Sequence, residues 1–182
     1  MRSAPNAWSL TDLPPLDPGD VHVWRMRLTL DGIPPGQVAA HLSAAERRRR
    51  DAFLDGSAGD RWGLVRGVLR ELLGAYTGER PASLNFELSG YGKPMLPGRV
   101  SFSVAHTDAL ALYAVARDIR LGIDVERIDP ARASLLVADA FMSAAESERL
   151  RTCDDVRARE FFRLWTRREA LIKARGTGWF DE

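Results

Sequence analysis

Two carboxylates, Asp124 and Glu126, lie in the otherwise apolar stretch RLGIDVERI at residues 120–128. Acidic side chains have low strand propensity and cost free energy when they are buried without a partner. Successive side chains of a strand point to opposite faces, so we expect Gly122, Asp124 and Glu126 to share one face. Such a face can hold a divalent cation, and the glycine would leave room for a ligand. A strand with a solvated acidic face is the alternative.

A second candidate group lies on a long helix predicted over residues 155–175. Trp165, Glu169 and Lys173 are spaced four residues apart and therefore form one stripe. The stripe begins with an aromatic side chain typical of a core, which indicates that its charged end reaches the margin of a cleft. Three carboxylates and one lysine suit Mg²⁺ and phosphate, because Mg²⁺ prefers oxygen ligands and lysine adds positive charge. An exposed helix pair, worth about 0.2–0.5 kcal/mol, is the alternative.

The distribution of basic residues adds further candidates. Of 26 basic residues only Lys93 and Lys173 are lysine, and arginine cannot replace a compact, titratable ammonium. Both are therefore candidate functional residues, with chance survival as the alternative. Lys93 belongs to the loop GYGKP. The glycines and the proline of this loop would fix its conformation. His106 ends the strand-like FSVAH and is either a donor to an anion or a capping residue, whereas Arg47–Arg50 spread around a helix and mostly form a solvated face.

The elements that must position these residues follow from periodicity. Strands are predicted at 21–28, 83–89, 100–106, 109–116 and 120–128, and helices at 42–54, 58–75, 130–142, 143–151 and 155–175. Ser43 and Glu46 form a capping-box pattern at the start of the first helix. Each half of the chain thus offers strands and helices, which indicates a pseudo-duplicated α+β fold. We place the N-terminal half at 1–98 and the C-terminal half at 99–182.

The bulk composition excludes several classes. A chain of 182 residues favours one domain or two small halves that share a core. A net charge of +1 gives no reason to expect nucleic-acid or membrane binding, and no apolar run approaches the roughly 18 residues of a membrane span. The N-terminal stretch lacks the apolar core of a signal peptide. A single cysteine, Cys153, allows no internal disulfide, so we expect a cytoplasmic protein.

Four motifs together resemble one enzyme family. GKP at 92–94, FSVAHT at 102–107, GIDVERI at 122–128 and WTRREALIKARG at 165–176 are similar, in this order, to the 4′-phosphopantetheinyl transferases, over roughly residues 40–178. The resemblance is to the larger, monomeric, surfactin-type class. It implies two similar halves of antiparallel strands packed with helices. It also implies transfer of 4′-phosphopantetheine from coenzyme A to a serine of an acyl- or peptidyl-carrier protein, with Mg²⁺ required and 3′,5′-ADP released.

The resemblance also implies roles for the acidic and lysine residues. Asp124, Glu126 and Glu169 would hold Mg²⁺ against the pyrophosphate of coenzyme A. Lys173 would contact the same phosphates, and Glu169 would act as the general base. Asp124, Glu169 and Lys173 are therefore the expected catalytic residues.

A second set of roles concerns the nucleotide. By the same resemblance, His106 and Arg49 would face the 3′-phosphate, and Arg61 would lie beside them. Lys93 and Pro94 would line the adenine pocket. Both lysines of the chain thus fall in motifs that touch coenzyme A.

Some positions depart from the family pattern. Ala105 replaces a serine, Arg168 replaces a lysine, and Glu46 stands where some relatives have a basic residue. The family continues for several strands where this chain stops at Glu182, so we expect either a truncated piece or a differently closed second half. Two other functions remain open, namely a non-catalytic coenzyme A-binding module of the same fold and a Mg²⁺-dependent phosphohydrolase.

Overall fold

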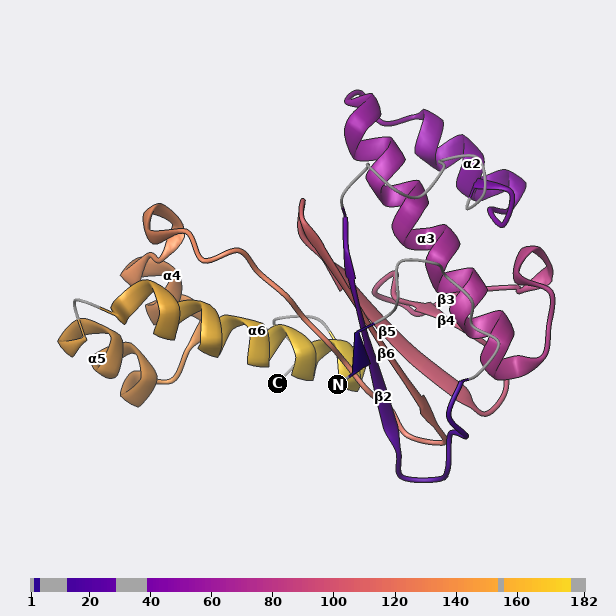
Figure 1. The fold of residues 1–182 in the computed structure, drawn as a ribbon. Coiled ribbons are helices and arrows are strands. Elements are labelled where there is room, and N and C mark those ends of the chain that lie inside the picture. Colours follow the sequence, from indigo (N-terminus) through magenta and orange to yellow (C-terminus); the bar gives the residue numbers. More distant parts are fainter. Residues whose placement is uncertain (1, 4–12, 29–38, 154–155, 178–182) are drawn as a thin grey trace.

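The computed structural model describes residues 2–3, 13–28, 39–153 and 156–177, and combines helices with a mainly antiparallel sheet. The strands are β1 (Arg2–Ser3), β2 (Val21–Arg27), β3 (Glu87–Leu88), β4 (Pro94–Met95), β5 (Val100–His106) and β6 (Leu110–Arg117). The helices are α2 (Ala44–Asp51), α3 (Gly56–Thr77), α4 (Leu135–Phe141), α5 (Ala144–Thr152) and α6 (Arg157–Arg175), with short 3₁₀ turns at Pro81–Ser83 and Pro130–Arg132. Figure 1 shows α3 against the sheet, and α4 and α5 well away from it.

The main sheet has the order β1-β2-β6-β5. The central strand β6 pairs antiparallel with β2, from Val21 opposite Ala116 onwards, and with β5, from Val100 opposite Arg117 onwards. β1 pairs with β2 in parallel. β5 is therefore an edge strand of this sheet. β3 and β4 form a separate two-stranded hairpin around the GYGKP loop.

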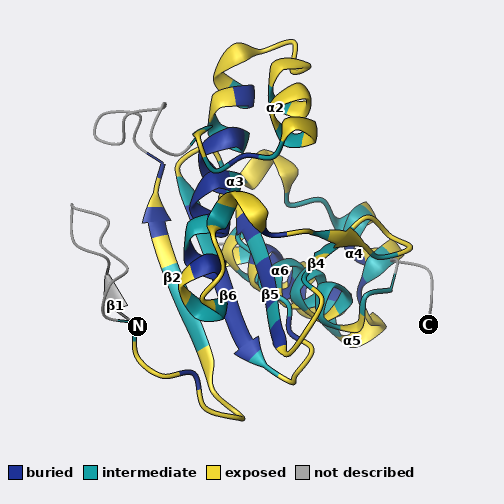
Figure 2. Cartoon of the chain, turned by 90° about the vertical axis from the view of Figure 1, so that its right-hand side faces the viewer, coloured by how far each residue is buried: buried dark blue, intermediate teal, exposed yellow. Residues whose placement is uncertain are grey.

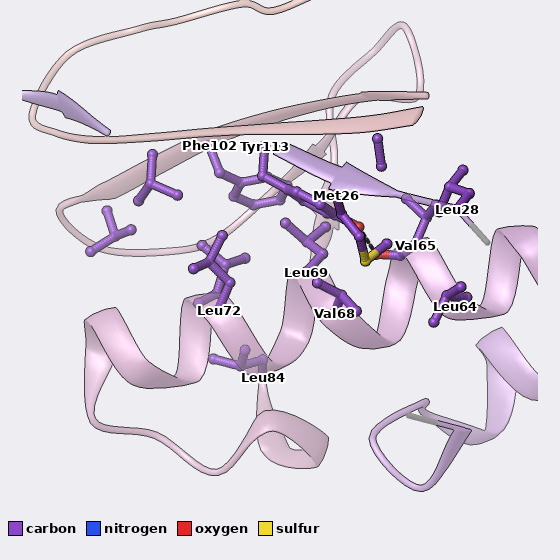
Figure 3. Close-up of a cluster of buried hydrophobic side chains, with 14 of the residues drawn as sticks. Met26, Leu28, Leu64, Val65, Val68, Leu69, Leu72, Leu84, Phe102 and Tyr113 are labelled. Atoms are coloured by element: carbon purple, nitrogen blue, oxygen red, sulfur yellow. Dashed lines mark hydrogen bonds between the residues drawn. The ribbon is translucent and has the colours of Figure 1, made fainter. Parts of the chain in front are cut away.

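Alternation along the strands directs the large side chains towards α3. Tyr113 and Val115 of β6 and Phe102 of β5 are buried in one cluster with the apolar stripe of α3 that includes Leu69 and Leu72. The hydroxyl of Tyr113 donates to the carbonyl oxygen of Val65, 3.2 Å away, so this buried polar group is satisfied (Figure 3). Asp55 caps the start of α3, and Gly78, at φ 77°, ends it. Figure 2 shows this buried layer between α3 and the strands.

The opposite face of the sheet carries small side chains. Ala114 and Ala116 of β6 are buried there against Leu121 and Ile123 of the acidic stretch. Small side chains allow the backbone of the acidic stretch to approach the sheet closely. The sheet thus has α3 on one face and the acidic stretch on the other.

A second hydrophobic core holds α4, α5 and the first half of α6 together. Its buried members include Leu150, Phe161, Phe162 and Leu164. Trp165 stacks on Phe161, with ring centroids 6.0 Å apart. The Ser143–Glu146 capping box starts α5. The aromatic beginning of the α6 stripe is therefore in a core, as predicted.

The structure confirms most predicted elements and corrects one that matters for the site. Residues 120–128 form no strand. The backbone N–H of Ile123 donates to the hydroxyl of Ser103, at 3.2 Å, and the carbonyls of Leu121 and Ile123 accept hydrogen bonds from lysine ammonium groups. These side-chain partners take the place of a strand ladder. The predicted strand at 83–89 is also shorter, since only Glu87–Leu88 pair, and β4 falls within the expected loop.

The predicted division into two similar halves stays a prediction. β5 and β6 lie after residue 98, yet they share a sheet with β2. Among the described residues after β6 there are helices but no further strand. No helix within the described ranges is both long and apolar enough to cross a membrane.

Candidate functional site

The acidic stretch meets the end of α6 at an ion pair. Lys173 Nζ lies 2.6 Å from Asp124 Oδ1 and 3.4 Å from the carbonyl oxygen of Ile123. The Asp124 side chain is only 7% exposed, whereas that of Lys173 is 29% exposed. The structure thus brings together an acid and a lysine that are 49 residues apart in the sequence.

The path of the acidic stretch follows the edge strand. Ile123 is bonded to Ser103 in the middle of β5, and Arg127 lies 3.7 Å from Asp108 in the turn after β5. The stretch therefore runs beside β5 in the same direction. Because β5 is an edge strand, this arrangement places the carboxylates at the margin of the sheet.

Gly122 has a different role from the one predicted. A Cβ atom at this position would lie 2.7 Å from the backbone nitrogen of Ala174 and would collide with the carbonyl oxygen of Ala170. The close neighbour is therefore the backbone of α6 and not a ligand. The glycine is needed because it lets the acidic stretch lie directly on the helix.

The other two predicted metal ligands lie near this junction but do not form a cluster with Asp124. Glu126 is 27% exposed and lies 3.9 Å from Arg132. Glu169 is half-buried on α6, one turn before Lys173. Within the described part of the chain, no three acidic, histidine or cysteine side chains are gathered closely enough to hold a metal ion. The roles of Glu126 and Glu169 as ligands stay predictions.

Lys93 lies at the same junction. Its Nζ donates to the carbonyl oxygen of Leu121, at 2.9 Å, and to that of Lys173, at 2.5 Å. Burial lowers the pKa of Lys93, and the nearby charges of Lys173 and Arg120 lower it further. Pro94, the next residue, begins β4 and is half-buried. Both lysines of the chain therefore meet at one place.

Two adjoining cavities open beside this junction. One has a volume of about 240 Å³ and is lined by the GYGKP loop, including Lys93 and Pro94, and by Phe102 of β5. The other has a volume of about 400 Å³, and its lining includes Lys93, Leu121 and Lys173. Apolar walls with a few convergent cations suit a ligand that carries both a ring system and phosphates.

Two of the basic residues predicted at the 3′-phosphate, Arg49 and Arg61, lie on α2 and α3. The guanidinium carbon of Arg49 lies 5.2 Å from the ring centroid of Trp62, and that of Arg66 lies 5.5 Å from the same ring. Burial lowers the pKa of Arg66. Arg61 is half-buried near the start of α3. Trp62 on α3 thus contacts two cations.

Glu46 is part of the structure that supports these arginines. Its carboxylate accepts from the backbone of Ser43, at 2.8 Å, and from Arg70 Nε, at 2.6 Å, and lies 3.4 Å from Arg66 Nε. The acidic residue at this position therefore balances two arginines of α3. Its charge keeps the pair of helices together.

Three further positions can now be placed. His106 is exposed at the end of β5, where its Nδ1 lies 3.2 Å from the carbonyl oxygen of Thr107. Ala105 is buried within β5. Arg168 donates to Glu146 at 3.1 Å, so its charge is directed to α5.

Sequence reasoning missed Ser103, whose hydroxyl receives the N–H of Ile123. It is a buried polar residue in an apolar strand. A serine within an otherwise apolar strand was the signal that the sequence offered.

Comparison with known proteins identifies related chains. The model of the 4′-phosphopantetheinyl transferase superfamily matches residues 120–182. The 4′-phosphopantetheinyl transferase HetI of Nostoc is 35% identical over 87% of this chain and 70% of its own length. A putative 4′-phosphopantetheinyl transferase of Synechocystis is 30% identical over 79% of this chain and 60% of its own length. The 4′-phosphopantetheinyl transferase Sfp of Bacillus subtilis is 31% identical over 53% of this chain and 43% of its own length.

Proposed function

Because this chain belongs to the 4′-phosphopantetheinyl transferase superfamily, we propose that it transfers 4′-phosphopantetheine from coenzyme A to a serine of an acyl- or peptidyl-carrier protein. The observation that carries the proposal is the junction of the acidic stretch with α6, where Asp124, Lys173 and Lys93 meet beside two cavities. The chain spans 70% of the Nostoc relative, 60% of the Synechocystis relative and 43% of the Bacillus relative.

We propose that a magnesium ion binds at this junction with Asp124 as one ligand. Asp124 Oδ2 is a buried carboxylate oxygen that has no hydrogen-bond partner among the described residues. Such an atom is costly unless a cation or a hydrogen-bond donor satisfies it. Asp124 would hold the ion together with Glu126 and Glu169, since Mg²⁺ takes oxygen ligands. When bound, the ion would neutralise charge on the pyrophosphate of coenzyme A.

The chemical step we propose is a displacement at phosphorus. The carrier serine oxygen forms a bond to the β-phosphorus of coenzyme A, and the bond from that phosphorus to the bridging oxygen breaks. The 3′,5′-ADP leaves with the bridging oxygen. Glu169 accepts the serine proton as the general base. Lys173 stabilises the negative charge that develops on the phosphate or the leaving group, because its ammonium is already held at the junction by Asp124.

The nucleotide end of coenzyme A would use the basic residues described above. We propose that Arg49, Arg61 and His106 contact the 3′-phosphate. Lys93 and Pro94 line the smaller cavity, whose apolar walls would suit the adenine ring. Holding both substrates in line could lower the barrier by about 7–11 kcal/mol.

The partner we propose is a carrier protein that binds a monomeric enzyme in the cytoplasm. The single cysteine supports a reducing compartment such as the cytoplasm. The carrier could serve fatty acid, polyketide or nonribosomal peptide synthesis.

One assay tests the proposed function directly. The protein is incubated with coenzyme A, Mg²⁺ and several apo carrier proteins, and the carriers are weighed by mass spectrometry. We expect one carrier to gain the mass of phosphopantetheine, with equimolar release of 3′,5′-ADP. Tight coenzyme A binding without any gain would instead identify a binding module. Release of 3′,5′-ADP without a carrier would identify a hydrolase.

A further inference from the structure

Lys93 connects two segments that are far apart in the sequence. One acceptor of its ammonium is the carbonyl of Leu121 in the acidic stretch, and the other is the carbonyl of Lys173 in the last turn of α6. The turn before Lys93 is fixed by Ser89, whose hydroxyl accepts from the backbone N–H of Lys93 at 3.1 Å. Gly92, at φ 77°, allows this turn. The side chain is therefore presented from a constrained loop.

Both acceptors need a partner. The last four carbonyls of a helix have no partner within the helix, and the carbonyl of Lys173 is one of them because α6 ends at Arg175. The carbonyl of Leu121 lies in a stretch that forms no strand. One ammonium satisfies both carbonyls, and its positive charge also complements the C-terminal end of the helix dipole.

The same two segments carry the reactive groups. Asp124 follows Leu121 by three residues, and Lys173 provides both the backbone carbonyl for Lys93 and the ammonium for Asp124. Between these bonds, Gly122 lies directly on the backbone of Ala170 and Ala174. Lys93, Gly122 and the Asp124–Lys173 pair therefore form one continuous contact line between the acidic stretch and α6.

We propose that Lys93 is a positioning residue that clamps the acidic stretch onto the last turn of α6 and so fixes Asp124 relative to Glu169 and Lys173. This inference rests on the proposed function, but it assigns Lys93 to the alignment of the catalytic groups and not to recognition of adenine. A lysine is required because a planar guanidinium is not a point donor between two carbonyls.

The test compares Lys93→Met, which keeps the apolar stem and removes the donors, with wild type. Amide hydrogen exchange is measured in residues 121–128 and in the last turn of α6. We expect exchange in both segments to accelerate about 10-fold or more, because two anchoring bonds are lost. We also expect kcat for transfer to fall about 10- to 100-fold, the range typical for residues that orient metal ligands.

Two comparisons separate the clamp from an adenine contact. Arg120→Met removes a neighbouring charge but neither clamp bond, so its exchange should match wild type. Affinity of Lys93→Met for 3′,5′-ADP, measured by calorimetry without metal, should stay within about 3-fold of wild type, because positioning acts on kcat more than on ground-state binding. Lys93→Arg should remain impaired in kcat.

Two results would overturn the clamp, and a third would overturn its dependence on lysine. Unchanged exchange in both segments of Lys93→Met would overturn the clamp, whatever the activity. So would a large loss of 3′,5′-ADP affinity with unchanged kcat, which would return Lys93 to the adenine pocket. Full activity of Lys93→Arg would remove the need for lysine geometry. If wild type transfers nothing, the proposed function fails, and the exchange experiment still decides whether Lys93 clamps the two segments.

Discussion

The substitution Gly122→Ala probes the contact between the acidic stretch and α6 directly. The added Cβ would lie 2.7 Å from Ala174 N and 2.9 Å from the carbonyl carbon of Ala170, and it would overlap the carbonyl oxygen of Ala170. Ordinary contacts begin at 3.4 Å, so the stretch must retreat by at least about 0.7 Å from Ala174 N alone. The obstacle is helix backbone, which cannot rotate away as a side chain can.

Two magnitudes follow from this retreat. Overpacking of this kind costs about 1–3 kcal/mol of unfolding free energy, and we expect the upper part of that range because backbone must move. The retreat also separates Asp124 from Lys173, whose charged atoms are 2.6 Å apart. A misplacement of about 1 Å can slow catalysis about 100-fold, so we expect a loss of that order in kcat.

Urea unfolding and the mass-spectrometric transfer assay measure both effects. Gly56→Ala is the matched control, because a Cβ at Gly56 meets nothing within 4 Å in the first turn of α3. Its stability should stay within about 0.5 kcal/mol of wild type, and its transfer rate should be unchanged. The reasoning is refuted if Gly122→Ala unfolds at the same urea concentration as wild type and transfers at the same rate.

Three further predictions concern separate parts of the molecule. Asp124→Asn should abolish metal-dependent transfer and leave the circular dichroism spectrum unchanged; normal transfer would remove Asp124 from the site. Trp62→Leu should raise KM for coenzyme A about 2- to 5-fold and leave KM for dephospho-coenzyme A unchanged, since the cation–π contact that holds Arg49 is worth about 0.5–1 kcal/mol; an equal change for both substrates would contradict this. Glu146→Gln should lose about 0.5–1 kcal/mol of stability at neutral pH, because hydrogen bonds from Ser143 lower the pKa of Glu146 below its usual 4.5. A lowered carboxyl pKa stabilises the fold above the usual pKa, and this contribution disappears as pH falls through the lowered value. Urea unfolding of Glu146→Gln and wild type should therefore converge in acid, and a difference that persists there would argue for a packing effect.

Local patterns in the sequence predicted much of the fold. The capping box of Ser43 and Glu46 and the alternation of β5 and β6 depend on neighbours within a few residues, and the structure confirms them. The prediction of a strand at 120–128 was wrong for a physical reason. Alternation indicates which side chains can be buried. It does not indicate whether a neighbouring strand is available to pair with the backbone N–H and C=O groups. Ile123 found the side chain of Ser103 as its partner.

The candidate site was predictable in its residues but not in its contacts. The scarcity of lysine drew attention to Lys93 and Lys173, and the structure brings them together. The acceptors of Lys93 are backbone carbonyls, which every residue has, so no sequence pattern marks them. Gly122 was predicted to leave room for a ligand. It does leave room, but the space is occupied by the backbone of α6. Neither partner could be inferred without the packing of α6.

Because α6 packs in the helical core at one end and contacts the acidic stretch at the other, a tilt of this helix would move both ends together. Its first half is fixed by Phe161 and Phe162 in the helical core, and its last turn holds Lys173 at the junction. A helix of 19 residues is about 28 Å long, so a tilt of about 5° around its last turn would move the far end by about 2.5 Å. A displacement of the helices at the far end would therefore be reduced about fivefold at groups that lie one helical turn from the pivot.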